Sequence, residues 1–429
     1  MPKGLGKKVA FITGVLIGQV YKKYVNSIVL ECTEIPNNVA VLVNFWQSKD
    51  VNYITDQSIF TDKDEIITIN NQHKEYKMKA ARFYDRGDIR IEDIPEPKVL
   101  PGTVGIQVAW CGICGTDLHE FMEGPIFIPP CGHPHPISGE SAPVIMGHEF
   151  SGVVYAVGEG VNDIQIGQHV VVEPYIIADD VPTGPNDKYH LSKNMNFIGL
   201  GGRGGGLSEK IAVQRRWVHP ISNDIPLDQA ALIEPLSVGH HAYVRSGAKV
   251  GDIALVGGAG PIGLLLSAIL KAKGLTVIIT ELSAKRKEKA IEAGVADYVL
   301  DPSKVDVVAE VMKITEDRGV DVAFECSSVN KVMDTLVAAM KPTGVVVIVS
   351  IWSHPATINV HSVVMKELDI RGTIAYVNDH QETIRLVEQG KINLEPFITQ
   401  RIALDDLVSK GFETLIHNNE SAVKIIVHP

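Results

Sequence analysis

The feature of this sequence that most constrains its fold is a glycine pattern between an apolar strand and a helix. Gly258, Gly260 and Gly263 follow the apolar residues 253–256 and open a helical pattern over 262–273. The first glycine permits a tight turn, the second lets a pyrophosphate approach the backbone, and the third allows the helix to pack closely on the strand. Backbone amides at the helix start can then face the phosphates. The pattern predicts a dinucleotide-binding unit.

The alternation of strand and helix continues after this unit. Apolar strands are predicted over 253–256, 276–280, 322–325 and 345–350, the last of which closes the series. Helices are predicted over 262–273, 284–293 and 331–340. Alternation of this kind is typical of an α/β fold with a doubly wound parallel sheet and helices on both faces.

An acidic residue near the end of the second predicted strand bears on the cofactor. Glu281 lies 23 residues after Gly258. A carboxylate there can accept hydrogen bonds from the adenosine ribose hydroxyls and repel a 2′-phosphate, which favours NAD over NADP. Lys285 and Arg286 follow closely and could assist a phosphate instead, or form a solvated helix face. NAD is therefore the preferred cofactor, with NADP left open.

The residues before the glycine pattern are typical of antiparallel strands. Period-two alternation and punctuating prolines predict strands over 78–84, 87–94, 105–110, 150–157 and 168–172. The glycine-rich segment 199–206 lacks the Lys-Ser/Thr ending of a phosphate loop, so we interpret it as a flexible turn before a strand over 209–213. A helix and a strand over 422–427 are expected after residue 376. A β-rich domain should therefore accompany the parallel-sheet domain.

Composition narrows the functional classes. A chain of 429 residues is expected to form two domains, and its net charge of −11 without a Lys/Arg cluster argues against a nucleic-acid partner. Glycines and Pro261 interrupt the longest apolar run, 253–270, so we do not expect a membrane span. Five cysteines are few and odd in number, which favours a reducing compartment, the cytoplasm, over a disulfide framework. A small-molecule substrate is expected.

A thiol, an imidazole and two carboxylates form a candidate metal site. Cys114 lies in a glycine-rich turn, His148 and Glu149 follow Gly147, and Glu234 precedes the dinucleotide unit. Zinc accepts sulfur, nitrogen and carboxylate oxygen in a tetrahedral shell, and a catalytic site keeps one position open. Each motif alone is a weak signal, but their conjunction with a dinucleotide pattern predicts zinc. Glu149 is expected as a fourth ligand or as an outer carboxylate.

Other thiols and imidazoles compete for metal binding. Cys111 forms a CxxC with Cys114, but a structural zinc would need two more soft ligands nearby. The segment 131–135, Cys-Gly-His-Pro-His, contains residues of the type needed for these two ligands, although its prolines favour a loop that lines a cleft. His240 and His241 are expected to form hydrogen bonds within the helix that follows Glu234.

Residues 1–77 show neither the period-two strands of the β-rich domain nor the strand–helix alternation of the parallel-sheet domain. An apolar stretch over 9–20 lies between pairs of lysines and lacks a small-residue cleavage site, which argues against a signal peptide. Val20 stands where a dinucleotide pattern would need its third glycine. We interpret this part as an atypical N-terminal extension, a fused or upstream-translated remnant that is poorly ordered after residue 47.

Four motifs in a fixed order carry a resemblance to a known family. Gly-Ile-Cys114-Gly-Thr-Asp-Leu-His, Gly-His148-Glu149, Glu234-Pro-Leu-Ser-Val-Gly and the glycine pattern resemble those of the zinc-dependent medium-chain alcohol and polyol dehydrogenases over residues 78–429. The resemblance implies a β-rich GroES-like catalytic domain, residues 78–236 and 375–429, and a Rossmann NAD-binding domain, residues 237–374. It also implies a homo-oligomer, a dimer or a tetramer.

The resemblance assigns roles to individual residues. It implies Cys114, His148 and Glu234 as zinc ligands, with Glu149 movable between the inner and outer shells. Thr116 would contact the substrate oxygen, and His119 would be the outer end of a proton relay. The residues implied around NAD are Gly258, Gly260, Ile262, Gly263, Glu281 and Arg286.

The resemblance also bears on metal count and substrate. Many relatives hold a structural zinc with four closely spaced cysteines, and residues 174–195 contain none, so we predict one catalytic zinc per subunit. The implied reaction interconverts a vicinal secondary diol and its hydroxyketone with NAD, most closely (R,R)-2,3-butanediol and acetoin, with diacetyl reduction alongside. Two alternatives stay open. One is a sorbitol- or threonine-type secondary alcohol dehydrogenase, and the other is a dinucleotide-binding protein without catalysis.

Overall fold

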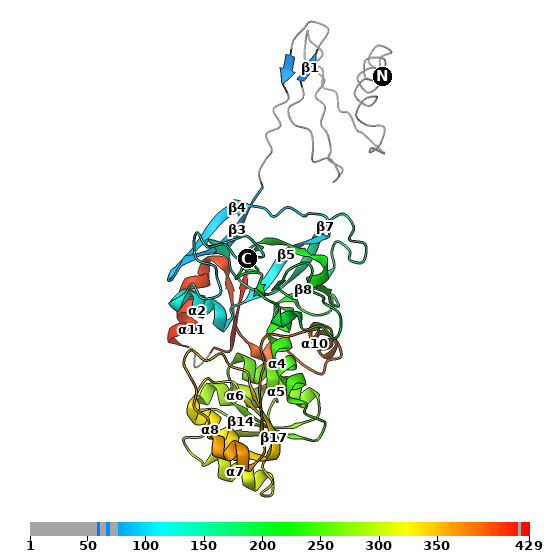
Figure 1. The fold of residues 1–429 in the computed structure, drawn as a ribbon. Coiled ribbons are helices and arrows are strands. Elements are labelled where there is room, and N and C mark those ends of the chain that lie inside the picture. Colours follow the sequence, from blue (N-terminus) through cyan, green and yellow to red (C-terminus); the bar gives the residue numbers. More distant parts are fainter. Residues whose placement is uncertain (1–57, 61–65, 69–75, 419–421) are drawn as a thin grey trace. The chain divides into compact units, whose positions relative to one another are not determined.

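The computed structural model describes residues 58–60, 66–68, 76–418 and 422–429 (Figure 1). The chain divides into two compact units, Met1–Lys74 and Glu75–Pro429. In the first unit, β1 (Ser58–Phe60) and β2 (Ile66–Thr68) pair antiparallel. Apart from these two strands, the expectations for the extension, including poor order after residue 47, concern residues outside the described ones.

The β-rich part of the second unit contains a larger and a smaller antiparallel-rich sheet, besides a short two-stranded pair. The larger is built from β5 (Thr103–Gly112), β7 (Glu149–Val157), β8 (His169–Val172), β11 (Lys210–Gln214), β12 (Val218–Pro220), β19 (Ile398–Ala403) and β20 (Lys424–His428). Its strand order is β12-β8-β7-β5-β20-β19, with β11 also paired to β5. The smaller sheet has the order β4 (Asp88–Pro95), β3 (Lys77–Asp85), β6 (Val144–Ile145). The predicted strands are confirmed.

The second part is a parallel sheet with flanking helices (Figure 1). Its strands are β13 (Ile253–Gly257), β14 (Thr276–Thr280), β15 (Tyr298–Leu300), β16 (Val320–Glu325), β17 (Met340–Ile348) and β18 (Asp369–Gly372). Their order is β15-β14-β13-β16-β17-β18, so the sheet grows outward in both directions from β13 and β16. Ligands of such sheets bind where the order reverses, at the carboxyl ends of these two strands. The prediction of a doubly wound parallel sheet is confirmed.

The helices of this part include α5 (Pro261–Ala272), α6 (Ala284–Glu292), α7 (Val307–Ile314), α8 (Asn330–Ala339) and α9 (Val360–Met365). The prediction that residues 345–350 close the series is wrong, because β18 pairs with β17 beyond them. The strand β18 escaped prediction because it is four residues long and carries Asp369 and Arg371 instead of an apolar run.

The remaining elements are short or connect the two parts. They are α2 (Gly115–Glu123), β9 (Tyr175–Ile176), β10 (Asn196–Phe197), α3 (Leu227–Ala230), α4 (Ile233–Ser246), α10 (His380–Glu388) and α11 (Glu413–His417), with single-turn segments at Tyr189–Leu191, Arg215–Trp217, Glu395–Phe397 and Leu404–Asp406 and a π-helix over Leu407–Phe412. Helix α10 confirms the helix expected after residue 376.

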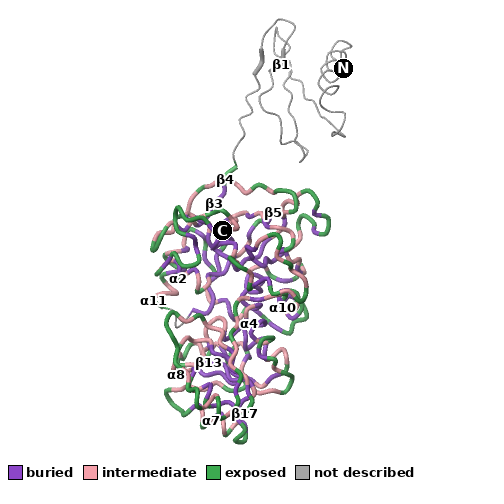
Figure 2. Tube along the Cα trace, viewed as in Figure 1, coloured by how far each residue is buried: buried purple, intermediate pink, exposed green. Residues whose placement is uncertain are grey.

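One hydrophobic core cluster crosses from the β-rich part to the parallel sheet. It joins Val171 of β8 and Ile426 of β20 with Leu264 of α5 and Val256 of β13. Buried chain runs through the interior of both parts in Figure 2, with exposed segments at the periphery. The two parts are therefore packed as one unit, and the domain boundaries drawn from the sequence stay a prediction.

Candidate metal and dinucleotide site

Strand pairing brings the distant ligand motifs together. Strand β5 delivers the chain to Cys114, and β7 begins directly after His148. In the antiparallel pairing of these strands, Gly112 lies opposite Glu149. Residues just after the end of one strand and just before the start of its antiparallel neighbour meet at one edge of a sheet. The register thus places the thiol and the imidazole side by side.

Cys114, His148 and Glu149 form the resulting candidate metal centre. Each offers a ligand atom, and these atoms all lie within 4.8 Å of one another. His148 is 5% and Glu149 1% exposed, while Cys114 is half-buried, so the cluster has a protected and an open side. Sulfur, imidazole nitrogen and carboxylate oxygen are the donors that zinc takes. The residues therefore fit a zinc ion.

Asp117 lies next to both Cys114 and His148, and the sequence analysis did not identify it. Helix α2, which was also not predicted, starts after Cys114, and the Asp117 carboxylate accepts a hydrogen bond from the Cys114 backbone N–H at 3.0 Å. Its other oxygen lies 3.6 Å from Nδ1 of His148, and both atoms are buried without a hydrogen-bond partner. Burial lowers the pKa of His148, but the charges of Asp117 and Cys114 outweigh it and raise that pKa well above its usual value. Asp117 is placed to orient the ring.

Glu149 is held by a buried lysine that the sequence did not indicate. Nζ of Lys424 donates to both Glu149 carboxylate oxygens, at 2.8 and 2.7 Å, and to the Ile113 carbonyl at 3.1 Å. Strand β20 pairs with β5 and so carries Lys424 to this position. Burial lowers the pKa of Lys424, but the Glu149 charge raises it overall. The Glu149 carboxylate is thus held by a buried ammonium group, and its alternation between ligand and outer carboxylate stays a prediction.

Glu234 lies close to the cluster but outside the set of three ligand atoms. It is the second residue of α4 and is 6% exposed. The Tyr376 hydroxyl donates to its carboxylate at 2.6 Å. Burial, and then the charge of Glu149, raise the pKa of Glu234 to about 7. Glu234 is therefore close enough for the charges of His148 and Glu149 to act on it. Its role as a direct ligand stays a prediction.

Thr116 and His119 lie on α2, three residues apart and hence on one face of the helix. The Cys114 thiol lies 3.8 Å from the Thr116 hydroxyl. Thr116 is half-buried and His119 is exposed, so the pair runs from the cluster towards solvent. The relay between them stays a prediction.

The competing thiols and imidazoles have other surroundings. Cys111 is buried with its thiol near the Gly112 carbonyl, and burial raises its pKa well above the usual value. Cys131 is exposed. The expectation that His240 and His241 bond within their helix is wrong. Nδ1 of each instead meets the Asp379 carboxylate, at 2.5 and 3.0 Å, because α10 packs on α4.

The glycine-rich segment 199–206 packs beside the metal cluster. The Gly206 backbone N–H donates to the Gly147 carbonyl at 2.7 Å, next to His148. A Cβ added to Gly199, whose φ is +88°, would lie 2.1 Å from that same carbonyl oxygen. The predicted turn before β11 is confirmed, and its glycines serve a close approach to the residue before His148.

The dinucleotide pattern has the geometry that its chemistry needs. Gly258 follows β13 with φ +106°, and Gly260 is the N-cap of α5. A Cβ on Gly260 would meet no protein atom within 4 Å, whereas a Cβ on Gly263 would lie 2.1 Å from the Gly258 carbonyl oxygen. The second glycine therefore leaves open space at a helix start, where phosphate binds well, and the third permits packing.

Glu281 lies where the ribose-binding carboxylate is expected. Its oxygens accept hydrogen bonds from the backbone N–H groups of Ala259, at 2.7 Å, and Ser283, at 2.8 Å. The carboxylate is thereby fixed beside the glycine turn. Ile262 is half-buried in the first turn of α5, and the Arg286 N–H donates to the Ser283 hydroxyl at the start of α6. Their contacts with NAD stay predictions.

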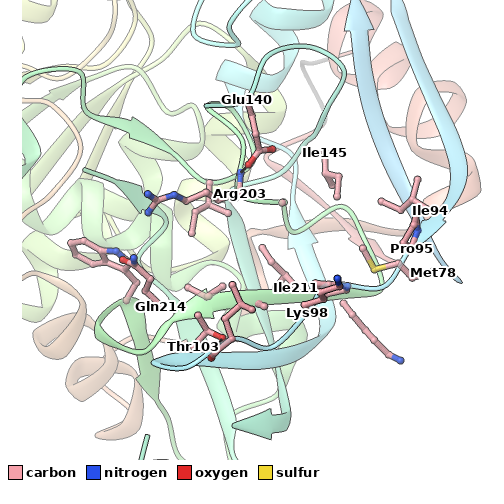
Figure 3. Close-up of a pocket in the computed structure, with 18 of the residues that line it drawn as sticks. Met78, Ile94, Pro95, Lys98, Thr103, Glu140, Ile145, Arg203, Ile211 and Gln214 are labelled. Atoms are coloured by element: carbon pink, nitrogen blue, oxygen red, sulfur yellow. Dashed lines mark hydrogen bonds between the residues drawn. The ribbon is translucent and has the colours of Figure 1, made fainter. Parts of the chain in front are cut away.

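A cavity of about 440 Å³ lies in the β-rich part, away from these residues (Figure 3). Met78 and Ile211 line it together with Glu140 and Arg203, and the Arg203 backbone N–H donates to the Glu140 carboxylate at 2.7 Å. Its lining includes no predicted ligand and no residue of the glycine pattern. This cavity is therefore separate from the candidate site.

Comparison with known proteins identifies the family. Residues 100–223 match the alcohol dehydrogenase GroES-like domain, and residues 261–389 match the zinc-binding dehydrogenase domain. An (R,R)-butanediol dehydrogenase of Neisseria gonorrhoeae is 84% identical over 352 residues, which are 82% of this chain and 99% of that protein. The chain belongs to the zinc-dependent medium-chain dehydrogenase family. The expected GroES-like and Rossmann architecture of this dehydrogenase is thereby confirmed.

Solved structures agree with this assignment. The 2R,3R-butanediol dehydrogenase of Bacillus subtilis is 45% identical to this dehydrogenase, with a TM-score of 0.78 over 82% of this chain and 99% of that chain. A structure described as a zinc-binding dehydrogenase of Sinorhizobium meliloti bound to NADP is 29% identical, with a TM-score of 0.72 over 82% and 100% of the two chains. Zinc and a nicotinamide dinucleotide are thus the cofactors of this family. Within the described residues of the dehydrogenase, no helix has the length and apolarity to cross a bilayer.

Proposed function

We propose that this dehydrogenase interconverts a vicinal secondary diol and its hydroxyketone with NAD, with (R,R)-2,3-butanediol and acetoin as the substrate pair and diacetyl as a further substrate for reduction. The observation that carries the proposal is the largely buried Cys114–His148–Glu149 cluster in a chain whose dinucleotide pattern is intact. The 84% identity to a protein named (R,R)-butanediol dehydrogenase supports the diol over the sorbitol- and threonine-type alternatives.

In the oxidative direction, the carbinol C–H bond breaks and its hydride passes to C4 of the nicotinamide ring. The hydroxyl proton leaves to solvent, so one diol and NAD⁺ give one hydroxyketone, NADH and a proton. Zinc would be held by Cys114, His148 and Glu149, with Glu234 as a further donor, and would supply Lewis acidity to the reacting oxygen. The cofactor carries the redox chemistry, and the protein aligns the reacting atoms.

The chain's own residues would guide the proton. The Thr116 hydroxyl, 3.8 Å from the Cys114 thiol, is near enough to the cluster to contact a substrate oxygen. His119 is exposed on the same helix face, and imidazole is the side chain that most often passes protons to and from solvent in enzymes. We therefore assign the inner position of the relay to Thr116 and the outer position to His119.

We propose NAD rather than NADP as the cofactor because of the Glu281 carboxylate. It is fixed by two backbone amides beside the glycine turn, where a 2′-phosphate would meet its negative charge. A cysteine-bound structural zinc is not expected, because residues 174–195 contain no cysteine. The free state of the four described cysteines supports a cytoplasmic enzyme.

We propose a homo-oligomer, and the exposed edge of the parallel sheet is the observation that supports it. Strand β18 is the last strand in the order, and large apolar side chains nearby in sequence are exposed, namely Val360, Val364, Met365 and Ile374. Exposed apolar surface next to an unpaired strand edge favours pairing with a second copy. Light scattering at micromolar concentration tests this, and a monomer would contradict it.

The experiment for the activity pairs two cysteine variants. Cys114→Ala should lose the zinc of this cluster and NAD-linked turnover, whereas Cys111→Ala, which changes a buried thiol outside the cluster, should keep both. Rates are measured by NADH absorbance for the butanediol stereoisomers, acetoin, diacetyl, sorbitol and threonine. A Cys114→Ala enzyme that lacks the zinc of this cluster but keeps full activity would refute the proposal. NADH binding without turnover of any substrate would favour the non-catalytic alternative.

A further inference from the structure

Three segments that are distant in sequence meet at a second group of ligand-type side chains. Glu173 follows β8, His219 lies on β12, and His380 begins α10. Each offers one ligand atom, and these atoms all lie within 4.8 Å of one another. Strands β12 and β8 are neighbours, with His219 opposite Val171, which sets the first two side chains together.

The carboxylate and one imidazole of this group already face each other. Nε2 of His219 lies 3.0 Å from one Glu173 oxygen, and the Tyr189 hydroxyl donates to the other at 2.5 Å. Glu173 is 3% exposed, and the His219 side chain is 17% exposed. An ion could therefore enter past His219 and meet a carboxylate that is already oriented.

His380 is the residue that a purely structural hydrogen-bond network does not explain. It is fully buried, and neither of its ring nitrogens has a hydrogen-bond partner. The Val172 carbonyl lies near enough to act on the ring, and the ring centroid lies 5.1 Å from that of His219. A buried unpaired imidazole costs free energy, so native proteins satisfy such groups. A ligand at this position would satisfy it.

We propose that Glu173, His219 and His380 bind a second divalent metal ion, separate from the Cys114 cluster. Two histidines and one glutamate are a set with which proteins bind zinc, leaving a fourth position for water. The separation of 3.0 Å between the Glu173 oxygen and the His219 nitrogen suits two ligands of one ion, since each would lie about 2.0–2.2 Å from zinc.

The ion would tie the start of α10 to the β-rich sheet. The rings of His380 and Tyr376 lie 4.9 Å apart, and the Tyr376 hydroxyl donates to Glu234 at 2.6 Å. The segment that positions Glu234 would thus be anchored at its far end by the metal. The second site does not depend on the proposed substrate. It would bring the content to two metal ions per subunit, whereas the absence of a four-cysteine lobe had predicted one.

Metal stoichiometry of the purified full chain tests the proposal. After dialysis against excess zinc and then metal-free buffer, wild-type protein should hold two ions per chain by elemental analysis. His219→Asn and His380→Asn should each hold one, as should Cys114→Ala, while His169→Asn, a neighbouring histidine outside both clusters, should hold two. A wild-type count of one that Cys114→Ala reduces to zero would overturn the proposal, as would two ions retained in both His219→Asn and His380→Asn.

Cobalt gives a second readout that does not depend on how well the variants fold. A cobalt ion in the Cys114 cluster has a thiolate ligand and shows sulfur-to-metal charge transfer, whereas an ion bound by Glu173, His219 and His380 has none. Titration of metal-free wild-type protein with Co²⁺ should therefore give two equivalents of ligand-field absorption but only one of charge transfer. One equivalent of each, with no further binding, would refute the second site.

Discussion

Lys424→Met tests whether the buried ion pair stabilises the metal cluster. Nζ of Lys424 donates to both oxygens of Glu149 and to the Ile113 carbonyl, and the two side chains are only 3% and 1% exposed. Methionine retains the length of the lysine side chain but removes its charge and its donors. The Glu149 carboxylate would be left buried and unpaired.

The expected magnitude follows from the distance and the burial. At 2.7 Å and an effective dielectric constant of about 20, two unit charges attract by about 6 kcal/mol. Desolvation offsets part of this gain, and removal of one partner of a buried pair costs about 3–5 kcal/mol. We expect Lys424→Met to lower the free energy of unfolding of the metal-free protein by that amount. Adding Glu149→Gln should recover part of the loss, because no charge then lies unpaired.

Urea unfolding followed by tryptophan fluorescence and circular dichroism measures the loss, provided that the two transitions coincide. Lys79→Met is the matched control, since it breaks an ion pair with Asp405 whose side chains are 48% and 65% exposed. Exposed pairs contribute little to stability because water screens them. A loss for Lys424→Met no larger than that of the control would refute the assignment of the Lys424–Glu149 pair as a stabilising element.

Three further perturbations test other parts of the site. Asp117→Asn should weaken zinc affinity by about 10–100-fold, measured by competition with a chelator, because the outer partner of His148 is altered; unchanged affinity would contradict the positioning role. Gly260→Ala should weaken NADH binding in a fluorescence titration and leave the melting temperature unchanged. Gly263→Ala, whose Cβ would lie 2.1 Å from a carbonyl oxygen, should weaken binding and also lower the melting temperature. Equal effects of the two variants would argue against the assigned roles. A hydrogen bond from Arg385 is the main cause that lowers the pKa of Glu382 to about 2. A lowered pKa gives stabilisation that is present above the unfolded value of 4.5 and is lost as the pH falls from there towards 2. The melting-temperature difference between wild type and Glu382→Gln should therefore be constant from pH 8 to 6 and shrink below pH 4.5, and a difference that grows in acid would contradict the sign.

The parallel-sheet part was predictable because its signals are local. The run before Gly258 and the helix after it lie within about twenty residues, and each glycine has a separate steric reason for its place. Strands β15 and β18 were not predictable in this way. They are three and four residues long, and they become strands because a longer neighbour offers its hydrogen-bonding edge.

The candidate ligands were predictable for a similar reason, while their supporting partners were not. Cys114 and the His148-Glu149 pair occur in short motifs, but Lys424 reaches Glu149 only through the pairing of β20 with β5. The sequence nevertheless contained an indication of both supporting residues, Asp117 and Lys424. Asp117 stands three residues after the cap residue of α2, the usual place for a capping carboxylate, and Lys424 interrupts an apolar run, where lysine is rarely buried without a partner.

The Lys424–Glu149 pair has a consequence for synthesis of the protein. The two residues are 275 positions apart, and a ribosome adds about 5–20 residues per second. Glu149 therefore leaves the ribosome roughly 15–55 seconds before the ammonium group that neutralises it. During that interval the strands that carry Cys114 and His148 cannot close over the carboxylate without burying a bare charge. Nascent chains shorter than 424 residues should keep this edge hydrated and exchange its amide protons rapidly, and protection should appear only when β20 is added.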